Sequence, residues 1–170
     1  MSVIQADTYA DSTALTITLA SLASTTADPP VGRESSYIDQ SADLGLDALL
    51  DGKITTGTSP TASRQIQIWG WGSAYDGTTH RYPGGVTGGN AGLTPGAYWR
   101  NVMWPVLVID TSNVSDTTYT FAGIPFFRAY RGLMLPIRYG VFVFHSTGVA
   151  LNATAGNHEI RITNGKQAVV

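Results

Sequence analysis

The stretch Ile137-Arg-Tyr-Gly-Val-Phe-Val-Phe-His145 decides the fold class of this chain, together with the run His158-Glu-Ile-Arg-Ile-Thr163 that follows it. Both runs alternate in side-chain character at a period of two and are rich in β-branched and aromatic residues, which is typical of strands. A turn of mixed polar and apolar residues, 146–157, separates them. We therefore expect two strands that close a small all-β domain. No catalytic constellation is apparent near them, which favours a scaffold or surface protein over an enzyme.

Further strands are expected upstream of this pair. The run 44–50 ends at Asp51-Gly52, a dipeptide that favours a hairpin turn, and residues 53–55 are expected to begin the return strand. Pro105 interrupts a mostly apolar run and predicts an edge strand or a bulge, because proline cannot donate to a ladder. The other expected strands are 13–22, 31–38, 64–71, 102–110 and 117–124.

Roughly eight strands with turn signals between them, and no long amphipathic helix, predict an all-β fold. We expect a jelly-roll-like two-sheet antiparallel sandwich over residues 13–170, preceded by an extended N-terminal arm over residues 1–12. Periodicity alone does not distinguish a jelly roll from an immunoglobulin-like sandwich. The long loop 73–97 is rich in glycine, proline and asparagine, and such loops are usually functional or interface-forming. Residues 125–135 are expected to form a short helical or irregular crossover.

The composition narrows the possible functions. A chain of 170 residues can form one domain with its own core, and the absence of cysteine excludes disulfides, thiolate chemistry and cysteine zinc sites. Charged residues make up 13%, and a net charge of −2 gives no bulk attraction to nucleic acid or to an anionic membrane. Eight arginines against two lysines suit surfaces covered by partners, although codon or lineage bias explains the ratio equally well. Neither a secretion signal nor a membrane span is indicated.

Metal and catalytic sites are not expected. His80, His145 and His158 are isolated, without a histidine or carboxylate at metal-ligand spacing on the same strand face. His145 is expected near solvent at a strand end. The only glutamates are Glu34 and Glu159, and most aspartates occupy turn positions, so the paired carboxylates of a glycosidase are not indicated. We therefore predict no enzyme activity, no cofactor and no metal.

Large aromatic residues gather in or beside the long loop. Interface anchoring and core packing are the favoured interpretations, and a sugar-binding platform is the alternative. Arginines stand too sparsely among these aromatics for a groove that stacks nucleic-acid bases. The set is Trp69, Trp71, Tyr75, Tyr82, Tyr98, Trp99 and Trp104, of which Trp69, Trp71, Tyr82 and Trp99 would form the sugar platform.

Three segments resemble the virion proteins of tailed bacteriophages. They are Gly32-Arg-Glu-Ser-Ser36, Asp47-Ala-Leu-Leu-Asp-Gly-Lys-Ile-Thr-Thr-Gly-Thr-Ser-Pro60 and the C-terminal strand-turn-strand quoted above. In style, most of the chain is similar to the cysteine-free jelly-roll proteins of phage heads called cement or decoration proteins. The resemblance implies a structural protein that is made in the host cytoplasm and docks on the capsid surface. There it would reinforce contacts between major capsid protein subunits, often as a dimer or trimer.

This interpretation assigns partner contacts to the arm, to the loop and to the crossover. The alternatives are a structural protein of a tail, a baseplate or a head fibre, and a carbohydrate-binding β-sandwich for host attachment. Nucleic acid and membrane are not expected partners. The candidate interface residues are Ile4 and Tyr9 in the arm, Trp71, Tyr75, Tyr82 and Trp99 in or beside the loop, and Arg128 and Arg131 as cross-subunit partners of carboxylates.

Overall fold

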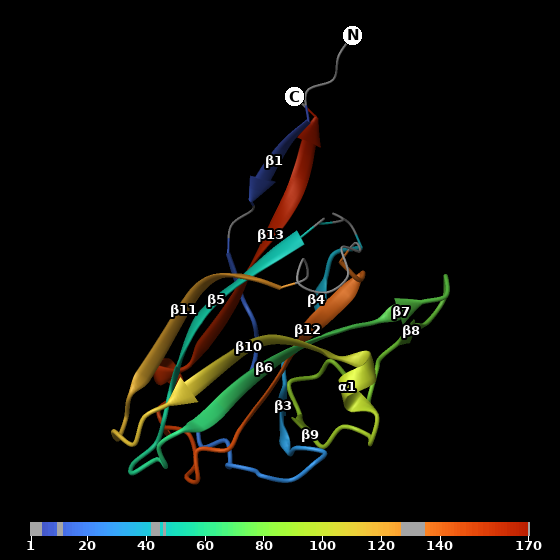
Figure 1. Cartoon of the computed structure of the whole chain (residues 1–170). Coiled ribbons are helices and arrows are strands. Elements are labelled where there is room, and N and C mark those ends of the chain that lie inside the picture. The colour runs from blue at the N-terminus through green and yellow to red at the C-terminus, as the bar shows by residue number, and fades with distance from the viewer. Residues whose placement is uncertain (1–4, 10–11, 42–44, 46, 127–134, 170) are drawn as a thin grey trace.

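Two antiparallel sheets form a sandwich in the computed structural model, which describes residues 5–9, 12–41, 45, 47–126 and 135–169 (Figure 1). The first sheet contains β1 (Gln5–Tyr9), β2 (Thr13–Ala14), β13 (Glu159–Val169), β5 (Asp47–Thr55) and β11 (Thr118–Pro125). The second contains β10 (Trp104–Thr111), β6 (Arg64–Gly72), β12 (Arg138–His145), β3 (Gly32–Glu34), β4 (Ile38–Asp39) and β9 (Gly92–Leu93). A small hairpin of β7 (Ala74–Tyr75) and β8 (His80–Arg81) and the short helices α1 (Trp99–Val102) and η1 (Ala155–Asn157) complete the described elements.

The strand order is that of a jelly roll. Strands β1 and β2 follow each other along β13, and β3 and β4 follow each other along β12, so each pair acts as one strand. Over the described residues, the eight strands so defined have the orders 1-8-3-6 and 2-7-4-5 in the two sheets. This is a sandwich of two Greek keys. The predicted all-β, jelly-roll-like sandwich is confirmed.

The two C-terminal strands do not pair with each other. Strand β12 lies in the second sheet and β13 in the first, so residues 146–158 cross from one sheet to the other. Each strand is central in its own sheet, since β12 lies between β6 and β3, and β13 lies between β1 and β5. The segment that indicated the fold class therefore supplies one inner strand to each layer.

The core lies between the sheets and follows the alternation expected from the sequence. Ile66 and Ile68 of β6 and Val141 and Val143 of β12 are fully buried there. Their counterparts in the first sheet are Leu50, Ile54, Ile160 and Ile162. Burial of such side chains contributes roughly 1.5–3 kcal/mol each to folding.

The expected hairpin at Asp51-Gly52 is wrong, because β5 runs straight through this dipeptide. A Cβ at Gly52 would lie 2.2 Å from the Glu159 carbonyl oxygen, so the glycine allows a close approach of β13. Asp51 accepts a hydrogen bond from the N–H of Gly123, at 2.7 Å, where β11 bulges. Both residues thus serve the ladder of a central strand and not a turn.

Other expected boundaries are confirmed in part. Pro105 lies in edge strand β10, where the register shifts between Pro105 and Leu107, as predicted. The strand expected over 13–22 is reduced to β2, although Leu15 and Leu19 keep the alternation and are buried. Of the crossover expected over 125–135, residues 127–134 lie outside the described residues.

The expected N-terminal arm is an edge strand over its described part. Residues Gln5–Tyr9 pair in continuous antiparallel register with Val169–Gly165, and β2 continues along the same side of β13. A domain boundary between residues 12 and 13 therefore divides the first strand of the jelly roll. The alternating pattern starts at residue 13, which is why the sequence indicated a boundary there.

Substitution of Gly70 tests the packing of β6 against β10. A Cβ at Gly70 would lie 2.3 Å from the Trp104 ring, and overpacking of this kind costs about 1–3 kcal/mol of unfolding free energy. Gly156→Ala is the matched control, because nothing lies within 4 Å of a Cβ there. Urea unfolding should show a clear loss for Gly70→Ala and a change within about 0.5 kcal/mol for Gly156→Ala. Equal stabilities would contradict this packing.

Candidate functional site

A two-stranded ribbon extends beyond the sandwich. Over the described residues, the pairing of β13 with β5 extends from Glu159 to Gly165, whereas its pairing with β1 continues to Val169. In Figure 1 this ribbon of β1 and β13 projects from the body of the molecule. An isolated two-stranded ribbon is marginally stable in water, so further pairing or packing would stabilise it.

The edge strands differ in how well they resist the addition of another strand. Edge strand β10 carries Pro105 and a register shift, and edge strand β11 ends at Pro125 and bulges between Phe121 and Ile124. Strand β9 has only two residues. Prolines, bulges and short length all disfavour edge-to-edge pairing. Strand β1 has a continuous five-residue register without proline, and no described strand pairs with its outer side. Among the described edge strands of more than two residues, β1 is therefore the one without a proline or a register shift, and we call its outer side the open edge of β1.

A second apolar cluster lies on the outer face of the second sheet. Residues 73–103 cover this face with Val86, Leu93, Trp99 and Met103, which pack on the sheet residues Trp71 and Phe142. Trp99 contacts Trp69 edge-on, with 4.4 Å between ring centroids. The long loop and the outer face of the second sheet thus enclose a second apolar core.

This cluster corrects two of the interface assignments. Trp71 is 0% exposed and Trp99 is 1% exposed, so neither side chain reaches the surface. The sugar platform that depended on them is lost for the same reason. Alternation did place Trp69 and Trp71 on the outer face of their strand, but the loop buries that face.

Glu34 holds the loop onto this cluster. Its carboxylate is buried and accepts hydrogen bonds from the backbone N–H groups of Thr87 and Gly88, at 2.9 and 3.3 Å to Oε2, and from the Thr87 hydroxyl. Its own N–H donates to the Ala91 carbonyl at 3.0 Å. One buried carboxylate thus satisfies several loop donors at once.

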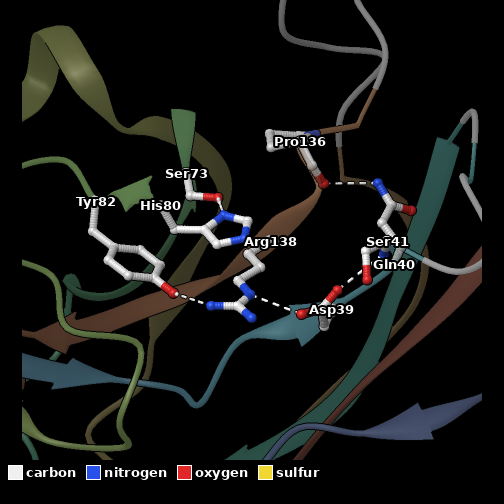
Figure 2. A network of polar contacts seen from close by, with 8 residues as sticks. All are labelled: Asp39, Gln40, Ser41, Ser73, His80, Tyr82, Pro136 and Arg138. Carbon is white, nitrogen blue, oxygen red and sulfur yellow. Dashed lines mark hydrogen bonds and ion pairs between the residues drawn. The ribbon is translucent and has the colours of Figure 1, made fainter. Parts of the chain in front are cut away.

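A second polar network lies at the surface, where β4 pairs with β12 (Figure 2). Asp39 and Arg138 are opposite each other in the register, and Arg138 Nε donates to Asp39 Oδ2 at 2.7 Å. Arg138 Nη1 donates to the Tyr82 hydroxyl at 3.3 Å, and the guanidinium carbon lies 4.4 Å from the centroid of the Tyr37 ring. Figure 2 shows Arg138 extended between Tyr82 and Asp39. Three contacts therefore fix one guanidinium.

Hydrogen bonding keeps this network ionised. The hydroxyl and backbone N–H of Ser41, followed by the Arg138 guanidinium, lower the pKa of Asp39 to about 2. The Tyr82 hydroxyl and Asp39 raise the pKa of Arg138. Next to Asp39, buried Gln40 donates to the carbonyl of Pro136 at 2.7 Å and accepts from the Gly45 N–H at 3.0 Å. The start of β12 is thus tied to β4.

Aromatic rings continue from this network toward the β7–β8 hairpin. Tyr37 and Tyr82 are stacked at 6.5 Å, Tyr82 and His80 at 6.5 Å, and His80 and Tyr75 at 4.6 Å. Successive rings are within 28° of parallel. Ser73 hydrogen-bonds His80 Nδ1 at 3.0 Å. We call this row of four rings the aromatic ledge.

The predicted interface residues divide into three groups. Tyr9, Tyr75 and Tyr82 reach the surface, with Tyr9 55% and Tyr75 47% exposed and Tyr82 half-buried. Trp71 and Trp99 are internal. Ile4, Arg128 and Arg131 lie outside the described residues.

The histidines do not form a cluster. Among the described residues, no group of three or more His, Cys, Asp or Glu side chains could hold a metal ion. His145 is fully buried, which corrects its expected place near solvent. Its ring nitrogens contact the Thr147 hydroxyl and the Leu22 carbonyl, both at 2.9 Å. Burial lowers the pKa of His145, and it also lowers that of His158, which directly precedes β13.

The network of Asp39 and Arg138 was not anticipated from the sequence. Tyr37 and Asp39 are two residues apart, which places them on one face of an extended segment. Their partner Arg138 is 99 positions from Asp39. Alternation could have indicated that Tyr37 and Asp39 share a face. Only the pairing of β4 with β12 brings Arg138 next to that face.

No family model, no curated protein and no solved structure matches this chain. Within the described residues, no helix is long and apolar enough to cross a membrane.

Replacement of Glu34 tests the attachment of the loop. In Glu34→Gln an amide NH2 group replaces one acceptor oxygen opposite the loop donors, which should cost about 1–3 kcal/mol of unfolding free energy. Amide hydrogen exchange at Thr87 and Gly88 should accelerate. Glu159→Gln is the control, because Glu159 forms a partly exposed pair with Arg161 and should lose less than about 1 kcal/mol. Comparable losses of unfolding free energy in the two variants would contradict the role of Glu34 as the clamp that holds the loop.

Acid should destabilise the protein through the buried His145. The pKa of His145 is lowered in the folded state, so the unfolded chain binds more protons once the pH falls below its ordinary value of 6.5. The stability contribution is therefore present above about pH 6.5 and lost as the pH decreases. The unfolding free energy should be lower at pH 5 than at pH 7.5, and His145→Gln should reduce this difference. An unfolding free energy that is equal or higher at pH 5 would contradict a lowered pKa of His145 in the folded state.

Proposed function

We propose that this chain is a non-enzymatic structural virion protein, a capsid cement or decoration protein that binds the outside of a phage head. In this role it contacts major capsid protein subunits and reinforces the joints between them. The jelly-roll fold and the three segments that resemble tailed-phage virion proteins support the proposal. A surface with few charges and mainly arginine as its cation suits contact with protein partners.

The observation that carries the proposal is the open edge of β1. Its backbone N–H and C=O groups on the outer side can pair with an extended segment of a neighbouring subunit, as in strand addition. The ribbon places this edge away from the rest of the sandwich. Backbone pairing requires little sequence complementarity, and many copies on one particle convert a modest affinity into strong attachment.

Two adjacent proline substitutions test this docking mode. Backbone N–H groups of neighbouring residues point to opposite sides of a strand. One of Asp7→Pro and Thr8→Pro therefore removes an outward N–H of β1, and the other removes an N–H that faces β13. The variant that loses an outward N–H should keep the melting temperature of the parent. It should bind heads prepared without this protein at least roughly tenfold more weakly, a loss of at least about 1.4 kcal/mol. The variant that loses an N–H facing β13 should have a lower melting temperature.

Co-sedimentation with heads measures the binding, and thermal unfolding reports on the fold. If both variants bind heads as tightly as the parent, strand addition at β1 is wrong even if the protein is a virion component. If the parent itself does not bind heads, the cement function is wrong.

A further inference from the structure

A cleft opens between the edges of the two sheets, next to the surface network. On one side lie Thr13 and Thr16 beside the first sheet, and on the other lie Ser36, Tyr37 and Asp39 beside the second. Asn164 of β13 contributes an amide. The cleft has a volume of about 490 Å³, within the range of about 300–1,000 Å³ that is usual for small-ligand sites. Its lining is dominated by hydroxyl, carboxylate and amide groups.

Tyr37 joins this cleft to the aromatic ledge. It lines the cleft, is 39% exposed, and is stacked with Tyr82 at 6.5 Å. From Tyr82 the ledge continues through His80 to Tyr75, which is 47% exposed. A polar cavity and a row of partly exposed rings thus form one continuous surface.

The polar groups at this junction are held in place before any ligand arrives. Arg138 is fixed by Asp39, by the Tyr82 hydroxyl and by the Tyr37 ring, and Asp39 is fixed in turn by the Ser41 N–H at 2.9 Å. Their side chains are 27% and 32% exposed, so both remain accessible to a ligand. Such preorganisation reduces the entropy lost on binding.

We propose that the cleft and the aromatic ledge form a binding site for neutral carbohydrate, with the Tyr37 ring at its centre. One face of a pyranose ring presents mainly C–H groups, which pack on an aromatic ring. Its hydroxyl groups both donate and accept, which matches the threonine and serine hydroxyls, the Asn164 amide and the Asp39–Arg138 pair. This proposal is independent of the place of the protein in a virion.

The charge of the site favours a neutral sugar over an anionic ligand. Arg138 is paired with Asp39 at 2.7 Å, so the site presents donors and acceptors without a net positive charge. Among the described residues, the cleft is lined by neither lysine nor arginine, and Arg138 borders it through its pair with Asp39. An extended proline-rich peptide also packs on tyrosine rings, but it has few donors for the hydroxyl and carboxylate oxygens of the cleft. The observations therefore favour carbohydrate.

The test is a binding screen of the full chain on an array of neutral and N-acetylated oligosaccharides, followed by calorimetric titration with the best ligand. Tyr37→Ala should weaken binding at least about tenfold. Tyr98→Ala is the matched control, because Tyr98 is 79% exposed and lies outside the cleft and the ledge, and it should change the affinity less than about twofold. Melting temperatures of all variants establish that they are folded.

A second variant covers the case in which Tyr37→Ala does not fold. Thr16→Arg introduces a long side chain at an exposed position of the cleft wall, away from the ledge, and should also abolish binding. The proposal is overturned if no glycan binds at millimolar concentration, or if the affinity is unchanged in both Tyr37→Ala and Thr16→Arg. It is equally overturned if a proline-rich peptide binds this surface and no glycan does.

Discussion

Burial of the inner faces of β6 and β12, together with Trp71 and Phe142 on their outer faces, is the constraint on which the rest of the structure depends. Ile66, Ile68, Val141 and Val143 point into the sandwich, whereas alternate residues of the same strands point into the cluster under the long loop. An antiparallel sheet commonly leaves one face to water. Here the long loop must stay in place, because its departure would expose Trp71 and its apolar neighbours.

This constraint explains why the loop is held by a buried carboxylate. Glu34 belongs to β3, which pairs directly with β12, so the clamp is built into the same sheet that the loop covers. It also explains where function remains possible. Trp71, Trp99 and Trp104 are buried inside the molecule. Among the described residues, two features that suit partners are the open edge of β1 and the polar and aromatic surface around Tyr37. The first suits another protein chain, and the second suits a small polar ligand.

The sequence predicted the layers better than the connections between them. Alternation in 64–71 and 137–145 identified the inner strands, and Pro105 identified an edge, because these signals depend on neighbours along the chain. The dipeptide Asp51-Gly52 led to a wrong prediction of a turn. Glycine is required at position 52 because a Cβ there would collide with the carbonyl oxygen of Glu159, which is far away in sequence. The burial of Trp71 and His145 was likewise decided by distant segments, the loop around Val86 and the Leu22 carbonyl. The pairing of Asp39 with Arg138 needs a register that no local pattern specifies.

We propose that this jelly roll joins neighbouring subunits on a phage head through the edge of β1. Cryo-electron microscopy of particles that carry the protein, at a resolution that traces β1, tests it most directly. We expect many copies on the outer surface of the head, each in contact with major capsid protein, with an extended segment of a neighbour paired to β1. Location at a single vertex or in the tail, absence from the particle, or a β1 edge that faces solvent in every copy would contradict it.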